Sequence, residues 1–113
     1  MEVVSKKQLP NEIIKKGKFY WHKDSSIKGL HPSYVYKKDD KKNKYNIVCF
    51  TSSKGRRRKK LNKNINPNSN DDCYVLNNPQ IVKRKSFTHE LVGYKVTNHQ
   101  DKARIKYIAN KKK

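Results

Sequence analysis

The sequence predicts a mainly β protein: a small, strongly bent barrel of about six to seven short strands, followed by one C-terminal helix. Short runs of aromatic and β-branched residues recur after Gly17, and turn-forming residues separate them, which is typical of strands. Only the last segment has the apolar spacing and the end residues of a helix. With 113 residues, the chain is expected to form one domain with one small core.

The chain divides into an N-terminal extension, residues 1–14, and a single barrel domain, residues 15–113. The extension is polar around a few apolar residues, and a short helix is expected after Pro10. In the domain, the charged segment 38–44 suits a hairpin loop, and the Asn-rich segment 66–71 is a loop by composition. The predicted strands are residues 19–21, 33–36, 45–50, 61–65, 73–76, 80–85 and 93–96.

The helix is predicted to begin after Asn98, whose side chain can cap the first turn. Asp101 is a favourable acidic residue near the positive end of the helix dipole, and the lysines at the other end complement the negative end. The apolar residues of this segment are Ala103, Ile105, Ile108 and Ala109. One helix of this kind is expected to close the barrel.

The charge of the chain indicates the class of its partner. Lysine and arginine number 29 against 9 aspartates and glutamates, which gives a formal net charge of +20 at pH 7. These charges repel one another in a folded monomer unless a polyanion or an acidic protein neutralises them. Nucleic acid is the first candidate, because a basic surface that binds phosphates releases counterions, but an acidic inhibitory protein would satisfy the same electrostatics.

Cys49 and Cys73 lie inside predicted strands with no metal-type spacing, so they are expected to be small buried hydrophobic residues of a reduced, cytoplasmic protein. The apolar runs are too short for a membrane span, and residues 1–5 lack a signal-peptide core. There is no phosphate-binding glycine loop, no zinc spacing and no acidic cluster suited to magnesium. No metal and no cofactor are therefore expected.

The clearest chemical signal lies in residues 45–58, where a buried-looking strand ends in hydroxyl side chains and then in a guanidinium cluster. Arginine matches phosphate geometry with its planar fork, and hydroxyl donors held by a rigid strand suit a phosphodiester. Two simpler interpretations exist: Thr and Ser often end strands in ordinary turns, and charge runs often lie on solvated surfaces. The candidate residues are Thr51, Ser52, Ser53, Arg56, Arg57 and Arg58.

His31 is the candidate acid or base, because it precedes Pro32 at the entrance of a predicted strand and histidine exchanges protons near neutral pH. Cleavage of RNA by its own 2′-hydroxyl requires such exchange at two oxygens. The alternative is a surface histidine without a role. His22, near the end of another predicted strand, is a secondary candidate.

The aromatic residues of the first two predicted strands have two possible roles. They can stack on unpaired bases, but alternating aromatic residues of strands also form cores, so about half of them are expected in the core. These residues are Phe19, Tyr20, Trp21, Tyr34 and Tyr36.

The order of these motifs resembles the PemK/MazF family of bacterial toxins over about residues 15–109. Residues 16–21 resemble the family's opening Arg-Gly-Asp strand, with Lys18 in place of the acidic residue, and residues 31–35 are similar to its Arg-Pro-Val-Leu-Val strand. Residues 46–52 resemble the strand that delivers the family's catalytic threonine, and Thr51 takes that position. Further similar segments are residues 73–76, 80–82 and 91–93 with the final helix.

The resemblance implies an SH3-like barrel, a homodimer and a metal-independent endoribonuclease that cleaves single-stranded RNA and is silenced by an acidic antitoxin protein. In the family an arginine precedes the proline, and here His31 stands at that position without arginine's permanent charge or forked geometry. Either His31 moves protons while an arginine of residues 56–58 supplies the cation, or the chain binds RNA and has lost cleavage.

Three functions follow from the sequence. The first is a sequence-preferring endoribonuclease, a toxin of a toxin-antitoxin system, with His31 and Thr51 as catalytic residues. In it the phosphate- or RNA-binding residues are Ser52, Ser53, Arg56, Arg57, Arg58 and His22. The second is a non-catalytic nucleic-acid-binding module on the same barrel. The third is a protein-interaction domain whose basic surface docks an acidic partner.

Overall fold

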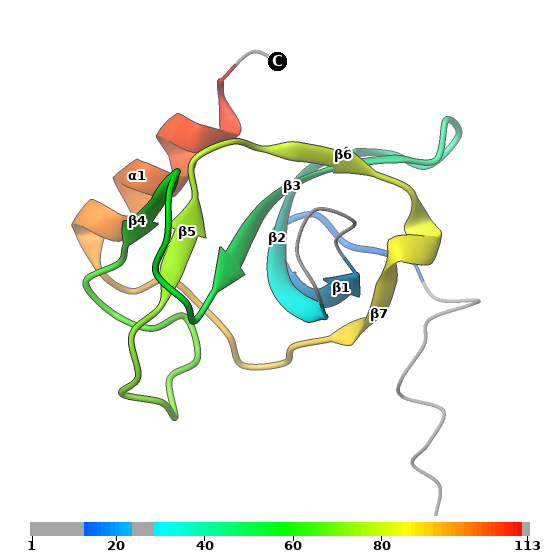
Figure 1. Cartoon of the computed structure of the whole chain (residues 1–113). Helices are drawn as coiled ribbons and strands as arrows, with labels where there is room; N and C mark the ends of the chain where they lie inside the picture. Colours follow the sequence, from blue (N-terminus) through cyan, green and yellow to red (C-terminus); the bar gives the residue numbers. More distant parts are fainter. Residues whose placement is uncertain (1–12, 24–28, 112–113) are drawn as a thin grey trace, which may run out of the picture.

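The computed structural model of the chain describes residues 13–23 and 29–111, and within them it contains seven strands and one α-helix (Figure 1). In chain order the elements are β1 (Phe19–Lys23), β2 (Leu30–Asp39), β3 (Lys44–Thr51), β4 (Arg58–Lys60), β5 (Tyr74–Leu76), β6 (Gln80–Val82), a 3₁₀ turn (Arg84–Ser86), β7 (Phe87–Glu90) and α1 (His99–Ala109). The predicted mainly β fold with one C-terminal helix is confirmed.

The strands form an antiparallel sheet in the order β4-β5-β3-β2-β1-β7. β3 pairs with β2 along one edge, and its other edge is shared, because the first half pairs with β6 and the end pairs with β5. Figure 1 shows the sheet curling around β1 and β2. β4 and β7 end the strand order without pairing with each other, so within the described residues the sheet is not closed and the predicted barrel is not confirmed.

The strand predicted at residues 61–65 is absent, and that prediction was wrong. Asn64 Oδ1 accepts a hydrogen bond from the Asn66 N–H at 2.9 Å, and Asn66 Oδ1 accepts one from the Asn68 N–H at 3.0 Å. These local bonds give the backbone an alternative to a strand ladder. The chain pairs earlier instead, through β4.

The strand predicted at residues 93–96 is also absent, because Gly93 has a φ of +91° and the Tyr94 N–H donates to the Leu91 carbonyl at 3.3 Å, which makes a turn. β7 forms just before it and pairs with β1. The predicted helix is confirmed as α1, with the Asn98 side chain accepting from the Asp101 N–H at 3.0 Å. The helix expected after Pro10 falls mainly outside the described residues, and residues 13–15 are not helical.

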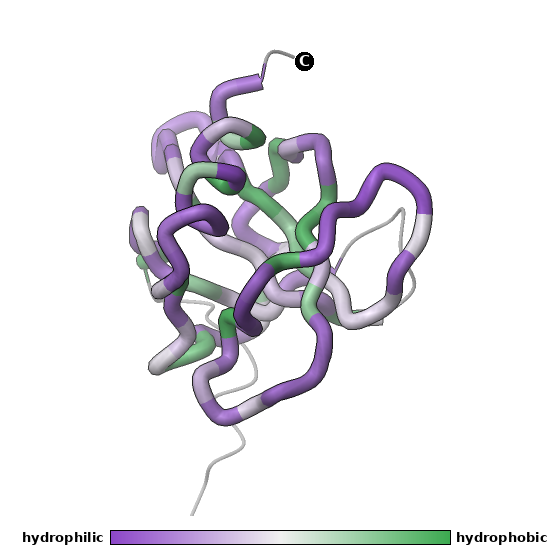
Figure 2. The backbone as a smooth tube through the Cα atoms, turned by 90° about the vertical axis from the view of Figure 1, so that its left-hand side faces the viewer, coloured by the Kyte–Doolittle hydropathy of each residue, from purple (hydrophilic) through white to green (hydrophobic). Residues whose placement is uncertain are grey.

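Two groups of buried side chains lie on the two faces of the sheet, because successive residues of a strand point to opposite faces. One group includes Phe19 and Val48 and packs against Ile105 and Ile108 of α1. The other is formed by Ile14, Tyr20, Val35, Tyr45, Ile47, Cys49 and Phe87. Figure 2 shows hydrophobic segments toward the centre and hydrophilic loops projecting from the body. Ile14, at the end of the predicted extension, is thus part of the core.

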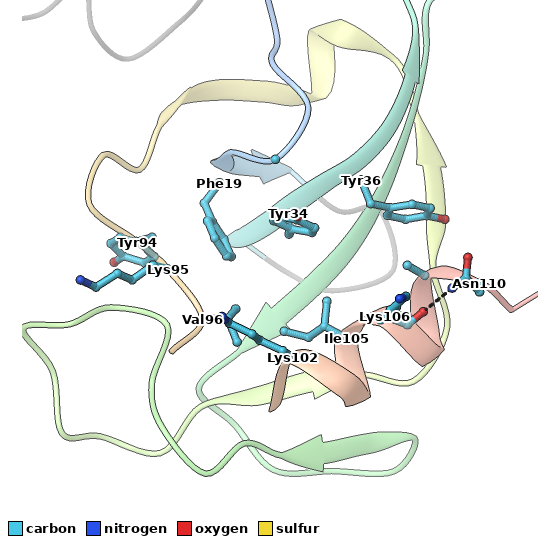
Figure 3. Close-up of a pocket in the computed structure, with 12 residues that line it drawn as sticks. Phe19, Tyr34, Tyr36, Tyr94, Lys95, Val96, Lys102, Ile105, Lys106 and Asn110 are labelled. Carbon is cyan, nitrogen blue, oxygen red and sulfur yellow. Dashed lines mark hydrogen bonds between the residues drawn. The ribbon is translucent and has the colours of Figure 1, made fainter. Parts of the chain in front are cut away.

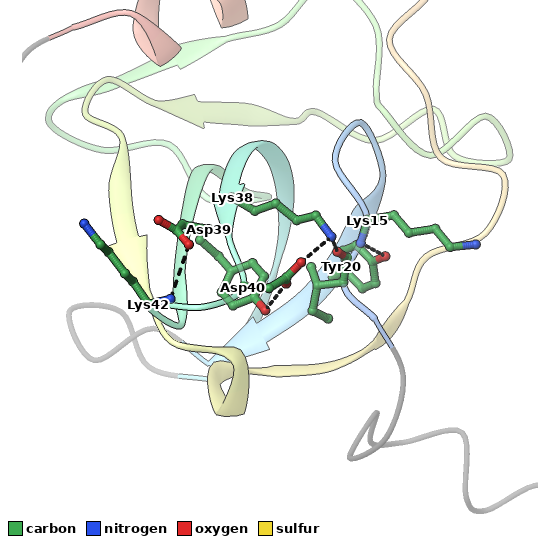
Figure 4. Close-up of polar contacts among 8 residues, drawn as sticks. Lys15, Tyr20, Lys38, Asp39, Asp40 and Lys42 are labelled. Carbon is green, nitrogen blue, oxygen red and sulfur yellow. Dashed lines mark hydrogen bonds and ion pairs between the residues drawn. The ribbon is translucent and has the colours of Figure 1, made fainter.

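A polar network fastens the β2–β3 hairpin to the segment before β1 (Figure 4). The Tyr45 hydroxyl donates to Asp40 at 2.7 Å, and Lys38 forms an ion pair with Asp40 at 2.9 Å and donates to the Ile14 carbonyl at 2.8 Å. Burial, together with the bond to Asp40, raises the pKa of Tyr45 to about 12. The Tyr45 hydrogen bond and then Lys38 lower the pKa of Asp40.

No helix within the described residues is long and apolar enough to cross a membrane. Cys49 and Cys73 are free thiols and both are buried, as the sequence predicted. Burial is the main cause that raises the pKa of the Cys73 thiol.

Candidate functional site

His31 and Thr51 meet at one end of the sheet. Antiparallel pairing joins Ser33 to Cys49 across β2 and β3, and the same register continued by two residues sets His31 opposite Thr51. Both residues, together with Ser52, line a cavity of about 270 Å³, which we name the His31 cavity. The structure therefore brings together three of the site residues predicted from the sequence.

The remaining walls of the His31 cavity combine aromatic, other apolar and polar residues. Trp21, Phe50 and Tyr94 contribute rings, and the loop between β4 and β5 contributes amides, a hydroxyl and two carboxylates; these loop residues are Asn64, Asn66, Ser69, Asp71 and Asp72. No lysine or arginine of the described chain lines this cavity. A phosphate group inside it would therefore meet hydroxyls and the carboxylates of Asp71 and Asp72, of which Asp72 forms an ion pair with Lys60 at 3.3 Å.

Thr51 ends β3 with its side chain 5% exposed, and its hydroxyl oxygen accepts a hydrogen bond from the Ser53 N–H at 3.3 Å. This is the turn expected where a Thr ends a strand. The hydroxyl hydrogen provides one donor as well. Ser52 is exposed beside it and also lines the cavity, whereas Ser53 does not.

The arginine cluster spans the end of the loop between β3 and β4 and the first residue of β4, and none of it lines the His31 cavity. The Arg58 side chain folds back on this loop, and its Nη1 donates to the Ser53 carbonyl at 2.7 Å. Its guanidinium lies over Gly55, at 3.4 Å from the position that a Cβ atom of residue 55 would take. Arg57 has a φ of +61°, and its carbonyl accepts from the Asn77 N–H at 2.9 Å. Arg56 and Arg57 are exposed.

His22 is fully buried in the sheet, opposite His31 in the β1–β2 pairing. Its Nδ1 lies 3.1 Å from the His31 carbonyl, and its Nε2 lies 3.6 Å from the Cys49 sulfur. Because a carbonyl can only accept, Nδ1 carries a hydrogen, which leaves Nε2 of a neutral ring to accept from the thiol. His22 thus supports the backbone at His31 from inside the fold and does not line the cavity.

A second hollow, of about 510 Å³, lies between the sheet and α1 (Figure 3). We name it the aromatic-lysine groove; its main lining residues are Phe19, Tyr34, Tyr36, Tyr94, Lys95, Lys102, Ile105 and Lys106. The sequence had indicated three of these rings as possible stacking residues, but it had not indicated Tyr94 or the lysines. The available signal was the spacing of Lys102 and Lys106, one helical turn apart on either side of Ile105.

The two hollows adjoin at Tyr94, which lines both. Tyr94 follows the turn at Gly93, and the next residue ties this segment to the β4–β5 loop, since the Lys95 N–H donates to the Ile65 carbonyl at 3.0 Å. Burial, and then the nearby Cys73, raise the pKa of the Tyr94 hydroxyl. Tyr94 is therefore the residue that the two hollows share.

Within the described residues, no group of three or more His, Cys, Asp or Glu side chains could hold a metal ion. No protein-family model matches the chain, and no curated protein shows significant similarity to it. The resemblance to PemK/MazF toxins stays a prediction from the motifs. The chemistry of the two hollows is therefore the basis for assigning a function.

Proposed function

We propose that this protein is an endoribonuclease that cleaves single-stranded RNA without a metal, with its chemistry in the His31 cavity. The observation that carries the proposal is the convergence of His31, Thr51 and Ser52 from two strand ends on one cavity. His31 and Thr51 also stand at the positions of the catalytic arginine and threonine in the PemK/MazF resemblance.

In the proposed reaction the 2′-oxygen of the RNA attacks the adjacent phosphorus, and the bond from phosphorus to the 5′-oxygen breaks. The products are a cyclic 2′,3′-phosphate and a 5′-hydroxyl. His31 makes one of the two proton transfers, taking the proton of the 2′-hydroxyl or giving one to the departing 5′-oxygen, and solvent water makes the other. The hydroxyls of Thr51 and Ser52 donate hydrogen bonds to the phosphate oxygens as negative charge develops on them.

In this proposal, the positive charge that pairs with the phosphate comes from residues outside the His31 cavity. Arg58 is already bonded to the Ser53 carbonyl, so the exposed Arg56 and Arg57 are the arginines suited to pair with a neighbouring phosphate. A net charge of +20 supports an RNA partner in general. The proposal includes the partners that the resemblance implies: a second copy of the chain, an acidic antitoxin protein and a cytoplasmic setting.

A second candidate is a nucleic-acid-binding module that does not cleave. One observation favours it: within the described residues, two carboxylates and no cation line the His31 cavity. Carboxylates oppose the negative charge that a reacting phosphate develops. A third candidate, a domain that docks an acidic protein, is supported only by the net charge.

The deciding experiment incubates the purified protein with a long single-stranded RNA in EDTA and maps the fragment ends. We expect discrete cuts with cyclic phosphate ends, and the His31→Ala variant should lower the cleavage rate about 100- to 10,000-fold with little change in RNA affinity. His99→Ala is the matched control, because His99 is exposed at the start of α1, away from the cavity. Full activity in His31→Ala, or fragments with 3′-hydroxyl ends, would exclude this mechanism, and bound but uncut RNA would support the second candidate.

A further inference from the structure

The aromatic-lysine groove has a row of rings along one side and a helix along the other. Figure 3 shows Tyr94, Phe19, Tyr34 and Tyr36 in a row, facing Lys102, Ile105 and Lys106 of α1. Phe19 links the row, with ring centroids 5.1 Å from Tyr34 and 6.3 Å from Tyr94. The volume of about 510 Å³ lies within the range of sites that bind small organic groups.

The rings are not simply core residues. Phe19 is 5% exposed and forms the floor, but Tyr34, Tyr36 and Tyr94 are only partly buried. An aromatic ring that is fixed by packing and open on one side offers a surface on which any nucleobase can stack. The four rings therefore form a platform for flat aromatic groups and select no particular base by themselves.

The rim of the groove is positively charged. Lys102 and Lys106 lie one turn apart on α1, Lys95 lies on the segment before the helix, and all three are exposed. In the described part of the chain none of these ammonium groups is in an ion pair, and no Asp or Glu lines the groove. The occupant that fits is a polyanion with flat aromatic groups.

We infer that the aromatic-lysine groove binds consecutive unpaired nucleotides of RNA, with the bases against the tyrosine rings and the phosphates beside the lysines. The inference rests on the proposed function only for the choice of RNA as the polymer. It supplies what the His31 cavity lacks, which is a cationic surface, and the shared Tyr94 connects the two hollows. A double helix does not fit the inference, since its bases are already stacked on one another.

The test measures binding of a fluorescent, single-stranded 2′-O-methyl oligoribonucleotide, which cannot cleave itself because its 2′-oxygen is blocked. We expect Lys102→Gln with Lys106→Gln to weaken binding about 10-fold at low salt and to reduce the slope of log affinity against log salt by about 1.4. The matched control is Lys41→Gln with Lys42→Gln, which removes the same charge from the exposed tip of the β2–β3 hairpin. An equal loss in both pairs would overturn the inference, because it would show a response to net charge alone.

A second pair of variants tests stacking. Tyr36→Leu should weaken binding of the same probe about 10-fold, whereas Tyr36→Phe, which keeps the ring, should bind as the wild type does. Unchanged binding in Tyr36→Leu, or equal affinity for a duplex of the same sequence, would overturn the inference. Because the probe is not cleaved, these measurements are independent of the cleavage assay. The binding inference can therefore be contradicted while the proposed cleavage is confirmed, and the proposed cleavage can be contradicted while the binding inference is confirmed.

Discussion

The His31 cavity and the aromatic-lysine groove adjoin at Tyr94, but they differ in charge. The cavity is lined by a histidine, the hydroxyl residues Thr51, Ser52 and Ser69 and two aspartates, whereas the groove carries tyrosine rings and lysines. In the proposed ribonuclease the difference separates two tasks, because binding energy gained away from the reacting phosphate can hold the strand while other groups act on it. Variants of His31 and Thr51 in the cavity should therefore change the cleavage rate, and variants of the groove should change affinity.

After His31→Ala, the largest effect is expected at Thr51. Replacing Thr51 with Val keeps the shape of this buried side chain but removes the hydroxyl, so the cleavage rate should fall about 100-fold or more, as when a single transition-state donor is lost. Binding of the 2′-O-methyl probe should change little. The rate is measured with a short RNA substrate at saturating protein.

Thr51→Ser is the control for this variant, since it keeps the hydroxyl at the end of β3. It should retain most of the activity. If Thr51→Val cleaves as fast as the wild type, the hydroxyl serves only the turn with the Ser53 N–H. The cavity would then act through His31 and Ser52 in the proposed mechanism.

The next effect concerns Asp101, which joins the two regions. Asp101 is 4% exposed, and its carboxylate accepts from the Asn62 N–H at 2.8 Å and the Lys63 N–H at 2.9 Å, which fastens the β4–β5 loop to α1. Asp101→Ala should lower the free energy of unfolding by about 2 kcal/mol, because two backbone donors lose a charged acceptor. Urea unfolding followed by circular dichroism measures this change.

Asp101→Asn provides the comparison, because its side-chain oxygen can still accept one of the two bonds. We expect an intermediate loss of stability. If Asp101→Ala unfolds at the same urea concentration as the wild type, the loop does not depend on this contact. In that case the two hollows behave as independent parts.

Much of the fold was predictable because local signals agreed with the tertiary structure. Val and Ile in β3 alternate between the two cores, and Asn98 with Asp101 marks the start of α1. β7 was missed since Phe87 is its only strongly apolar residue, and its pairing with β1 is a contact distant in sequence. Residues 61–65 resemble a strand by composition, but their asparagines bond to the nearby backbone.

The candidate site was predictable only for residues at the ends of strands that are neighbours both in the chain and in the sheet. Pairing of β2 with β3 ends at Ser33 and Cys49, two residues from His31 and Thr51, and the sequence had placed both of these residues at strand ends. The arginine cluster follows Ser53 in sequence, but none of its residues lines the cavity. The carboxylates of the cavity come from the β4–β5 loop, whose path no local pattern determines, so their presence was not expected.

A smaller effect is expected from the carboxylates themselves. Asp71→Asn removes one negative charge from the wall of the His31 cavity and should strengthen RNA binding about 3-fold at low salt, with the gain disappearing at high salt. Asp39→Asn, on the exposed part of β2, removes the same charge away from both hollows and should have less effect. If Asp71→Asn instead abolishes cleavage, the Asp71 carboxylate takes part in the reaction. The cavity would then differ from the groove by a carboxylate that the reaction needs.

The smallest functional effect is expected at Tyr45, which lies away from both hollows in the hairpin network. The pKa of Tyr45 is raised to about 12 in the folded protein, above the ordinary value of 10.0, so this hydroxyl contributes stability below pH 10 that is lost as the pH rises toward 12. Tyr45→Phe should therefore flatten the fall in melting temperature between pH 10 and pH 12, with cleavage and binding unchanged at pH 7. The melting temperature of both proteins across this pH range measures the effect. A fall of equal steepness in the variant would assign the alkaline transition to other groups, and a loss of RNA binding at pH 7 would show that the groove depends on the hairpin.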